Sequence, residues 1–115
     1  MSDSTQSREH YRLRYPTQGR PHFVLNGTVF TVTEISESGC RVQCDSEQSL
    51  LLHGDSEVVF TFNDGAQINS KTSFLRMTDD EVVLKLSPSI PLTVIIAEQH
   101  WVIRKFPRAS QKTDP

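Results

Sequence analysis

The sequence has little of what a membrane protein or a secreted protein needs. No apolar run in its 115 residues approaches the length of a transmembrane helix, which is roughly 20 residues. Residues 1–8 are polar, unlike the apolar stretch of a secretory signal. The length is typical of one domain. We therefore expect a single-domain cytoplasmic protein that does not insert into a membrane.

Cysteine is scarce, and its spacing argues against a cross-link. Cys40 and Cys44 fall in one predicted strand, where four residues at about 3.3 Å each would separate them by about 13 Å. A disulfide requires Cα atoms within about 7 Å, and a shared zinc requires both sulfurs about 2.3 Å from the ion. The sequence predicts two free thiols and no metal site.

Motifs of catalysis and of nucleoside triphosphate binding are missing. The four histidines show no metal-binding spacing such as His-x-x-x-His. Ser36 lacks the preceding glycine of a Gly-x-Ser-x-Gly elbow. Residues 79–81 are acidic, and we interpret them as a hairpin turn. We expect a protein that is not an enzyme and needs no cofactor.

Charge is distributed unevenly along the chain. Residues 1–20 carry +2 and residues 104–115 carry +3, whereas residues 21–103 carry −7. An acidic central region repels a polyphosphate, so neither DNA nor RNA is an expected partner. A module for single-stranded nucleic acid would also need basic residues between its aromatic residues, and these are almost absent here. The basic ends suit a small anionic ligand.

Short strands separated by turn residues follow from residue 21 onward. Asn26-Gly27, the strongest short hairpin signal, lies between the first two strands. The strands are predicted at residues 22–25, 28–35, 40–44, 57–62, 67–77 and 81–86. Such spacing is typical of a barrel or a sandwich, and closing a barrel removes exposed edges. We predict a mainly β fold, a small antiparallel six-stranded split β-barrel.

The last part of the chain follows another pattern. After Pro91, apolar residues recur at intervals of three and four, and proline suits a first helical position. A C-terminal α-helix is predicted at about 91–105. The predicted organisation is a flexible N-terminal arm over residues 1–20, the barrel with its helix over 21–106, and a disordered tail over 107–115.

Three arginines precede the barrel, in the segment Arg8-Glu-His-Tyr-Arg12-Leu-Arg14. A guanidinium offers a planar fork of donors to phosphate oxygens and to the O6/N7 edge of guanine, and it stacks on a base. A solvated basic linker would contain the same residues, so the arginines alone leave both interpretations open.

A second segment, Glu34-Ile-Ser36-Glu-Ser-Gly39, joins two predicted strands. Its carboxylate and hydroxyl could accept hydrogen bonds from a guanine, and Gly39 permits a positive φ and a close approach of the backbone to a ligand. By itself the segment is also an ordinary turn, in which the serines satisfy backbone groups.

In this order, the two segments resemble the PilZ family, which carries Arg-x-x-x-Arg before a barrel and Asp/Asn-x-Ser-x-x-Gly on it. The resemblance spans residues 8 to about 106. It implies a receptor for cyclic di-GMP, in which Arg8 and Arg12 would hold guanine edges and phosphates. Ser36 and Gly39 would shape the pocket, and residue 34 would accept from a guanine.

Glu34 departs from the family pattern, because its side chain is one methylene longer than aspartate. A contact worth roughly 1–3 kcal/mol would be weakened, which is about tenfold or more in affinity. Arg14 and Arg41 are candidate secondary contacts. The sequence is compatible with the binding of either one or two ligand molecules.

The resemblance also implies how a signal would be passed on. An arm that closes over the ligand would relay its level to a partner protein. Regulation of motility or biofilm is typical of the family. The alternative is a PilZ-like protein-interaction adaptor with weak or no nucleotide binding because of Glu34.

Overall fold

The computed structural model describes residues 12–107 of the chain. Arg8, the remainder of residues 1–11, and residues 108–115 lie outside the described part, and so do the predictions made for them. The elements in chain order are β1 (Leu13–Arg14), η1 (Thr17–Gly19), β2 (His22–Leu25), β3 (Thr28–Ile35), β4 (Gly39–Gln43), η2 (Gln48–Leu52), β5 (Ser56–Thr61), β6 (Gln67–Thr78), β7 (Glu81–Ser87) and α2 (Leu92–Lys105). Among the described residues, no helix is both long and apolar enough to cross a membrane.

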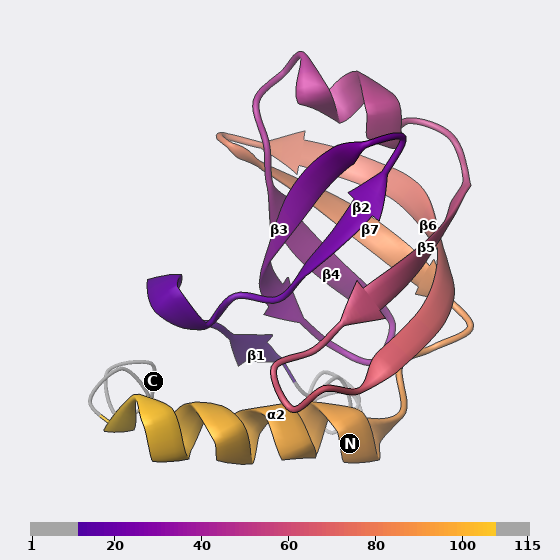
Figure 1. The fold of residues 1–115 in the computed structure, drawn as a ribbon. Helices are drawn as coiled ribbons and strands as arrows, with labels where there is room; N and C mark the ends of the chain where they lie inside the picture. The colour runs from indigo at the N-terminus through magenta and orange to yellow at the C-terminus, as the bar shows by residue number, and fades with distance from the viewer. Residues whose placement is uncertain (1–11, 108–115) are drawn as a thin grey trace, which may run out of the picture.

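Six antiparallel strands, β2 to β7, form a closed barrel (Figure 1). Their order is β3-β2-β5-β6-β7-β4, and β4 pairs with β3 to complete the circle. The pairing of β2 with β5 is restricted to His22 and Thr61, so the barrel is split there. The predicted mainly β barrel with a C-terminal helix is confirmed. The sequence did not predict β1, which pairs with the end of β3.

The hairpin of β2 and β3 has the turn geometry that its sequence favours. Asn26 and Gly27 both have positive φ, at 52° and 81°, as a two-residue turn between right-twisted strands requires. The register places Leu25 opposite Thr28. The predicted hairpin at Asn26-Gly27 is confirmed.

Two β-bulges interrupt the alternation of inward and outward side chains. In β3, Val32 pairs with Val42 and Glu34 with Arg41, so that Thr33 is an extra residue. In β6, the extra residue is Leu75. A bulge changes which face the following side chains point to. Val32 and Thr33 are therefore both buried, and Glu34 points outward.

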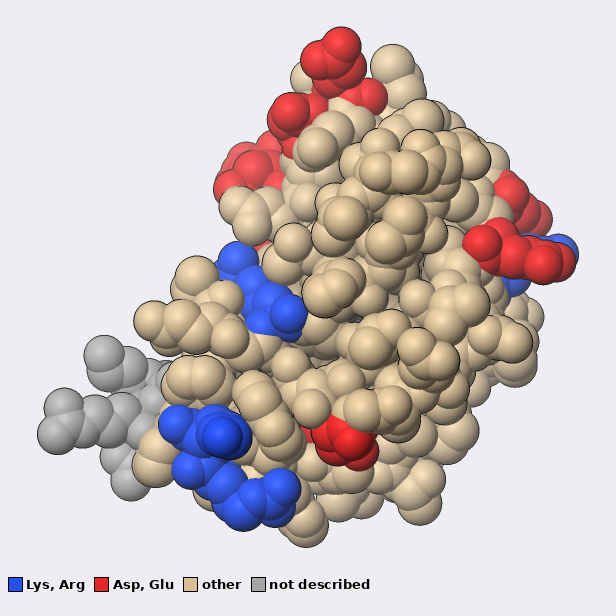
Figure 2. All heavy atoms as spheres, viewed as in Figure 1, with Lys and Arg blue, Asp and Glu red and all other residues tan. Residues whose placement is uncertain are grey.

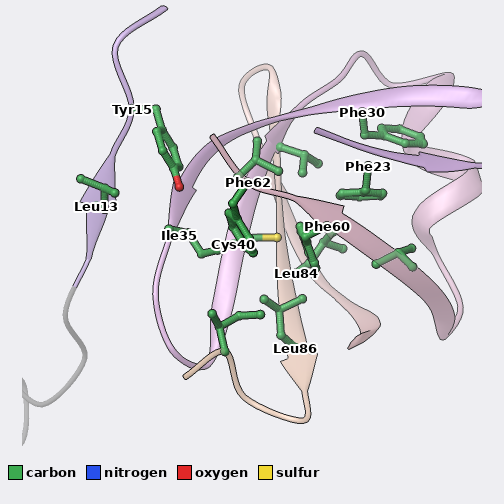
Figure 3. Packing of buried hydrophobic residues seen from close by; sticks show 14 of the residues in the cluster. Leu13, Tyr15, Phe23, Phe30, Ile35, Cys40, Phe60, Phe62, Leu84 and Leu86 are labelled. Carbon is green, nitrogen blue, oxygen red and sulfur yellow. The ribbon is translucent and has the colours of Figure 1, made fainter. Parts of the chain in front are cut away.

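Aromatic side chains fill the centre of the barrel (Figure 3). Phe23 packs against Phe30 and Phe60, with ring centroids 5.4 Å and 5.1 Å apart. Cys40 and Cys44 are buried free thiols, and burial raises the pKa of Cys40 to about 12. They serve as small core residues.

A buried polar cluster joins the N-terminal segment to α2, which lies across one end of the barrel (Figure 1). Glu98 of α2 is fully buried, and its carboxylate accepts hydrogen bonds from the Tyr15 hydroxyl (2.8 Å), the Asn63 side chain (3.2 Å) and the Asp64 backbone N–H (3.2 Å). Burial raises the pKa of Glu98, although these donors oppose the shift.

The described part of the predicted arm is packed onto the barrel. Leu13 and Tyr15 are buried, and the Tyr15 backbone N–H donates to the Thr33 carbonyl at 3.0 Å. Gly19 lies beneath Trp101, where an added Cβ would be 3.1 Å from the indole ring. Residues 12–20 thus lie on the barrel and not apart from it, which fixes the base of the arm.

Tyr15→Phe tests the buried cluster. The substitution keeps the ring but removes a hydrogen bond to a charged acceptor, so we expect the free energy of unfolding to fall by about 1.5–3 kcal/mol. Urea unfolding measures it. Ser89→Ala, which removes an exposed hydroxyl, is the control and should change little. Equal stabilities of the Tyr15 variant and the unmodified protein would show that the hydrogen bond from Tyr15 to Glu98 contributes nothing to stability.

Candidate functional site

A pocket of about 290 Å³ lies on the outside of β3, β4, β7 and β6. Five of the seven predicted binding residues line it: Arg12, Glu34, Ser36, Gly39 and Arg41. Arg14 lies beside the pocket, and Arg8 is outside the described residues. The fold therefore brings the two short sequence segments together.

The turn from Ser36 to Gly39 is held by its own hydrogen bonds. The Ser36 backbone N–H donates to the Gly39 carbonyl at 2.8 Å, and the Gly39 N–H donates to the Ser36 hydroxyl oxygen at 3.2 Å. The backbone of Leu86 in β7 donates to the Ser38 carbonyl at 2.9 Å. Ser36 thus holds this rim of the pocket in shape. The same hydrogen bonds are those of an ordinary turn, so they agree with both interpretations of the segment.

Gly39 is needed for a different reason from the one predicted. Its φ is not positive; among described glycines only Gly27 and Gly65 have positive φ. An added Cβ would instead lie 2.7 Å from the Leu84 carbonyl oxygen. Gly39 therefore does not use the positive φ that glycine permits, and its close approach is to the neighbouring strand.

Four charged side chains, Arg14, Glu34, Arg41 and Glu81, form an ion-pair set beside the pocket. Arg14 contacts Glu81 at 2.8 Å and Glu34 at 3.6 Å. Arg41 contacts Glu34 and Glu81, each at 3.8 Å. Strand register explains the set, since Arg14, Glu34 and Arg41 are opposite one another on β1, β3 and β4.

The ion-pair set changes the environment of three predicted residues. The Glu34 carboxylate faces two guanidinium groups, and Arg14 and Arg41 each face two carboxylates. A ligand that uses any of them must compete with, or share, these partners. The role of Glu34 as a guanine acceptor stays a prediction.

Glu81 is the least exposed member of the set, with 13% of its side chain exposed. Burial alone would raise the pKa of this carboxyl, but the hydrogen bond from Arg14 and the charge of Arg41 outweigh burial and lower it. The sequence pattern places Glu81 where the acidic turn at residues 79–81 meets the strand predicted at 81–86, and it indicates no role for this side chain at the pocket. Glu81 is the first residue of β7, which turns its side chain toward Arg14.

The pocket is also lined by residues that the sequence did not predict there, and three of them are exposed: Leu75, Arg76 and Lys85. Leu75 and Arg76 are consecutive residues of β6 and are both exposed because of the bulge. Strict alternation would have placed one of them inside, so no local sequence signal marks the pair. Lys85 lies opposite Gly39 on the adjacent strand.

A larger hollow of about 810 Å³ lies elsewhere, along β2, β5 and β6. None of the predicted binding residues lines it. The basic residue in its lining, Lys71, is opposite the acidic residue Glu57 on the adjacent strand. The smaller pocket is the better candidate for an anionic ligand, since its lining holds four basic residues.

Charged side chains are spread over the face shown in Figure 2, with two concentrations at opposite ends. Several acidic side chains lie at the end far from α2, whereas basic atoms gather over the C-terminal end of α2. Arg104 and Lys105 belong to the last turn of this helix. They suit the negative end of its dipole and lie outside the pocket.

Comparisons with known proteins support the fold. No protein-family model matches the chain, and no curated protein matches it. The uncharacterized Legionella protein Lpg0364 matches over 90% of this chain and 99% of its own, with 14% identity and a TM-score of 0.54. It shares the fold of this chain.

A second solved structure is the PlzA protein of Borreliella burgdorferi in complex with c-di-GMP. It matches over 87% of this chain and 44% of its own, with 13% identity and a TM-score of 0.48.

Gly39→Ala tests the close approach of β4 to β7. A methyl group would meet the Leu84 carbonyl oxygen, so we expect the free energy of unfolding to fall by about 1–3 kcal/mol. The matched control is Gly54→Ala, where an added Cβ meets nothing within 4 Å. Its effect should be about 0.5 kcal/mol or less. Equal effects of the two substitutions, measured by urea unfolding, would contradict the geometry.

Glu81→Gln tests the electrostatics of the ion-pair set. The lowered pKa of Glu81 means that the folded state favours its ionised form, so this stabilisation is present above the ordinary value of 4.5 and is lost as pH falls through the lowered value. Arg14 is 44% exposed, which limits the contribution to about 1 kcal/mol.

We expect Glu81→Gln to be less stable than the unmodified protein at pH 7, and the difference to disappear in strong acid. Urea unfolding at pH 7 and at low pH measures both. A difference that stays constant across this range would show that the ion pairs are not its source.

Proposed function

We propose that this chain is a receptor for cyclic di-GMP, not an enzyme, and that it binds the messenger in the pocket lined by Arg12, Glu34, Ser36, Gly39 and Arg41. The proposal is supported by one observation, namely that residues of both sequence motifs line the same pocket. Arg12 comes from the first motif and Glu34 to Gly39 from the second, and both line one pocket. The pairing of β1 with the end of β3 places the two motif segments side by side at this pocket.

The chemistry of the pocket fits the messenger's two kinds of polar group. Arg12 is exposed, and within residues 12–107 it makes no ion pair, so its fork of donors is available to a phosphate or a guanine edge. Glu34 offers acceptors, and 19% of its side chain is exposed. The volume of about 290 Å³ is at the lower end for ligand pockets.

A relay to a protein partner is the second part of the proposal. Arg12 directly precedes β1, and Tyr15 at the far side of β1 bonds to Glu98 of α2. A ligand that draws in Arg12 would therefore act on a segment linked to the helix. From the sequence, we propose that the arm with Arg8 closes over the ligand and that a cytoplasmic partner, in motility or biofilm regulation, detects the change.

The alternative function is a protein-interaction adaptor with weak or no nucleotide binding. One observation favours it: the Glu34 carboxylate is engaged by Arg14 and Arg41. If a guanine cannot displace or share these contacts, affinity falls. Titration of the unmodified protein distinguishes receptor from adaptor.

Arg12→Ala tests the receptor. Because Arg12 is exposed, the thermal midpoint should hardly change, whereas affinity for cyclic di-GMP should fall about ten- to hundredfold through loss of a bidentate contact. Isothermal calorimetry measures binding, with GTP and cyclic GMP as control ligands. Arg104→Ala, an exposed arginine of α2 outside the pocket, is the control variant.

Absence of any heat from the unmodified protein with high micromolar cyclic di-GMP would refute the receptor and leave the adaptor. A large fall in the thermal midpoint of Arg12→Ala would show that Arg12 is structural.

A further inference from the structure

The basic residues at the pocket divide into two groups. Arg14 and Arg41 belong to the ion-pair set, whereas no ion pair or side-chain hydrogen bond involves Arg76 or Lys85 within residues 12–107. Both of the latter are exposed. A free cation can bind an incoming anion without first losing a partner.

The scarcity of basic residues makes their position informative. Residues 21–103 hold four basic residues against eleven acidic ones. Three of the four, Arg41, Arg76 and Lys85, line this one pocket. Arg41 is held there by its ion pairs with Glu34 and Glu81, so it is the presence of Arg76 and Lys85 at the same pocket that favours an anionic ligand.

Strand register places Arg76 across the pocket from the ion-pair set. Arg41 on β4 is opposite Val83 on β7, and Val83 is opposite Arg76 on β6. Two strand spacings separate the Cα atoms of Arg41 and Arg76 by about 10 Å. Lys85, on the same side of β7 as Val83, lies opposite Gly39. The pocket therefore has a cationic edge on β6 and β7.

Between the edges the floor is open and partly apolar. Gly39 has no side chain, and Leu75 is 53% exposed because the bulge in β6 turns it outward together with Arg76. An exposed leucine beside a guanidinium can lie against the face of a planar base. Bulges often re-aim side chains at binding sites.

We propose that Arg76 and Lys85, with Leu75, form a second anion-binding edge of the pocket, which selects a ligand with two separated phosphates and a planar base over a mononucleotide. Arg12 contacts one phosphate and the Arg76–Lys85 edge contacts the other. This inference rests on the proposed function, and it assigns the second edge to residues that neither sequence motif contains.

The double variant Arg76→Gln with Lys85→Gln tests the edge. Both side chains are exposed, so the fold should be kept. We expect affinity for cyclic di-GMP to fall about ten- to hundredfold and the salt dependence of binding to weaken, whereas affinity for 5′-GMP should change less than threefold. The matched control is Arg104→Gln with Lys105→Gln, which removes the same charge outside the pocket and should leave both affinities within about twofold.

Calorimetry at two salt concentrations separates the outcomes. Binding by the unmodified protein with no loss in the Arg76/Lys85 variant would overturn the second edge and leave the receptor standing. Equal losses in the variant and in the Arg104/Lys105 control would also overturn it, because net charge alone would then explain the effect.

A second probe tests the edge if cyclic di-GMP does not bind, which would refute the proposed function. Inorganic pyrophosphate is added to ¹⁵N-labelled protein, and backbone amide shifts are followed. Larger shifts at Arg76 and Lys85 than at Arg104 and Lys105 support an anion-binding edge. Equal shifts at both places would overturn it.

Discussion

The contacts of Arg14 and Arg41 with Glu34 and Glu81 set the arrangement of charge beside the pocket. Four charges of alternating sign meet where β1, β3, β4 and β7 run side by side. They place two arginines and a carboxylate next to the ligand space but occupy them with one another. Within residues 12–107, the basic side chains of the pocket that make no ion pair are Arg12 on one side and Arg76 with Lys85 on the other. On this account, Glu34 matters first as the group that holds two guanidiniums in position.

The barrel supplies this arrangement through packing that lies outside the pocket. The bulge at Thr33 turns Glu34 outward, and the bulge at Leu75 turns Arg76 outward. At the base of the arm, Tyr15 is fixed by buried Glu98, which holds β1 against β3 and so brings Arg14 to Glu81.

Sequence reasoning predicted the strands well because turn residues separate them clearly. Asn26-Gly27 marks a hairpin, and the change from alternation to intervals of three and four residues marks α2. It could not predict the two bulges, since each depends on pairing with a distant strand, and it therefore missed Leu75 and Arg76. It also missed Glu98, because a glutamate on an amphipathic helix is usually exposed. The ion pairs of Arg14, Glu34 and Arg41 could not be predicted either, because they depend on a strand register that the local sequence does not contain.

A structure of the protein with cyclic di-GMP bound tests this account most directly. We predict phosphate oxygens within hydrogen-bonding distance of the guanidiniums of Arg12 and Arg76, with the bond between Arg14 and Glu81 kept near its present 2.8 Å. A ligand seated in the hollow along β2 and β5 would contradict it. So would a ligand in the pocket that is held by Arg14 and Arg41 after both have left their carboxylates.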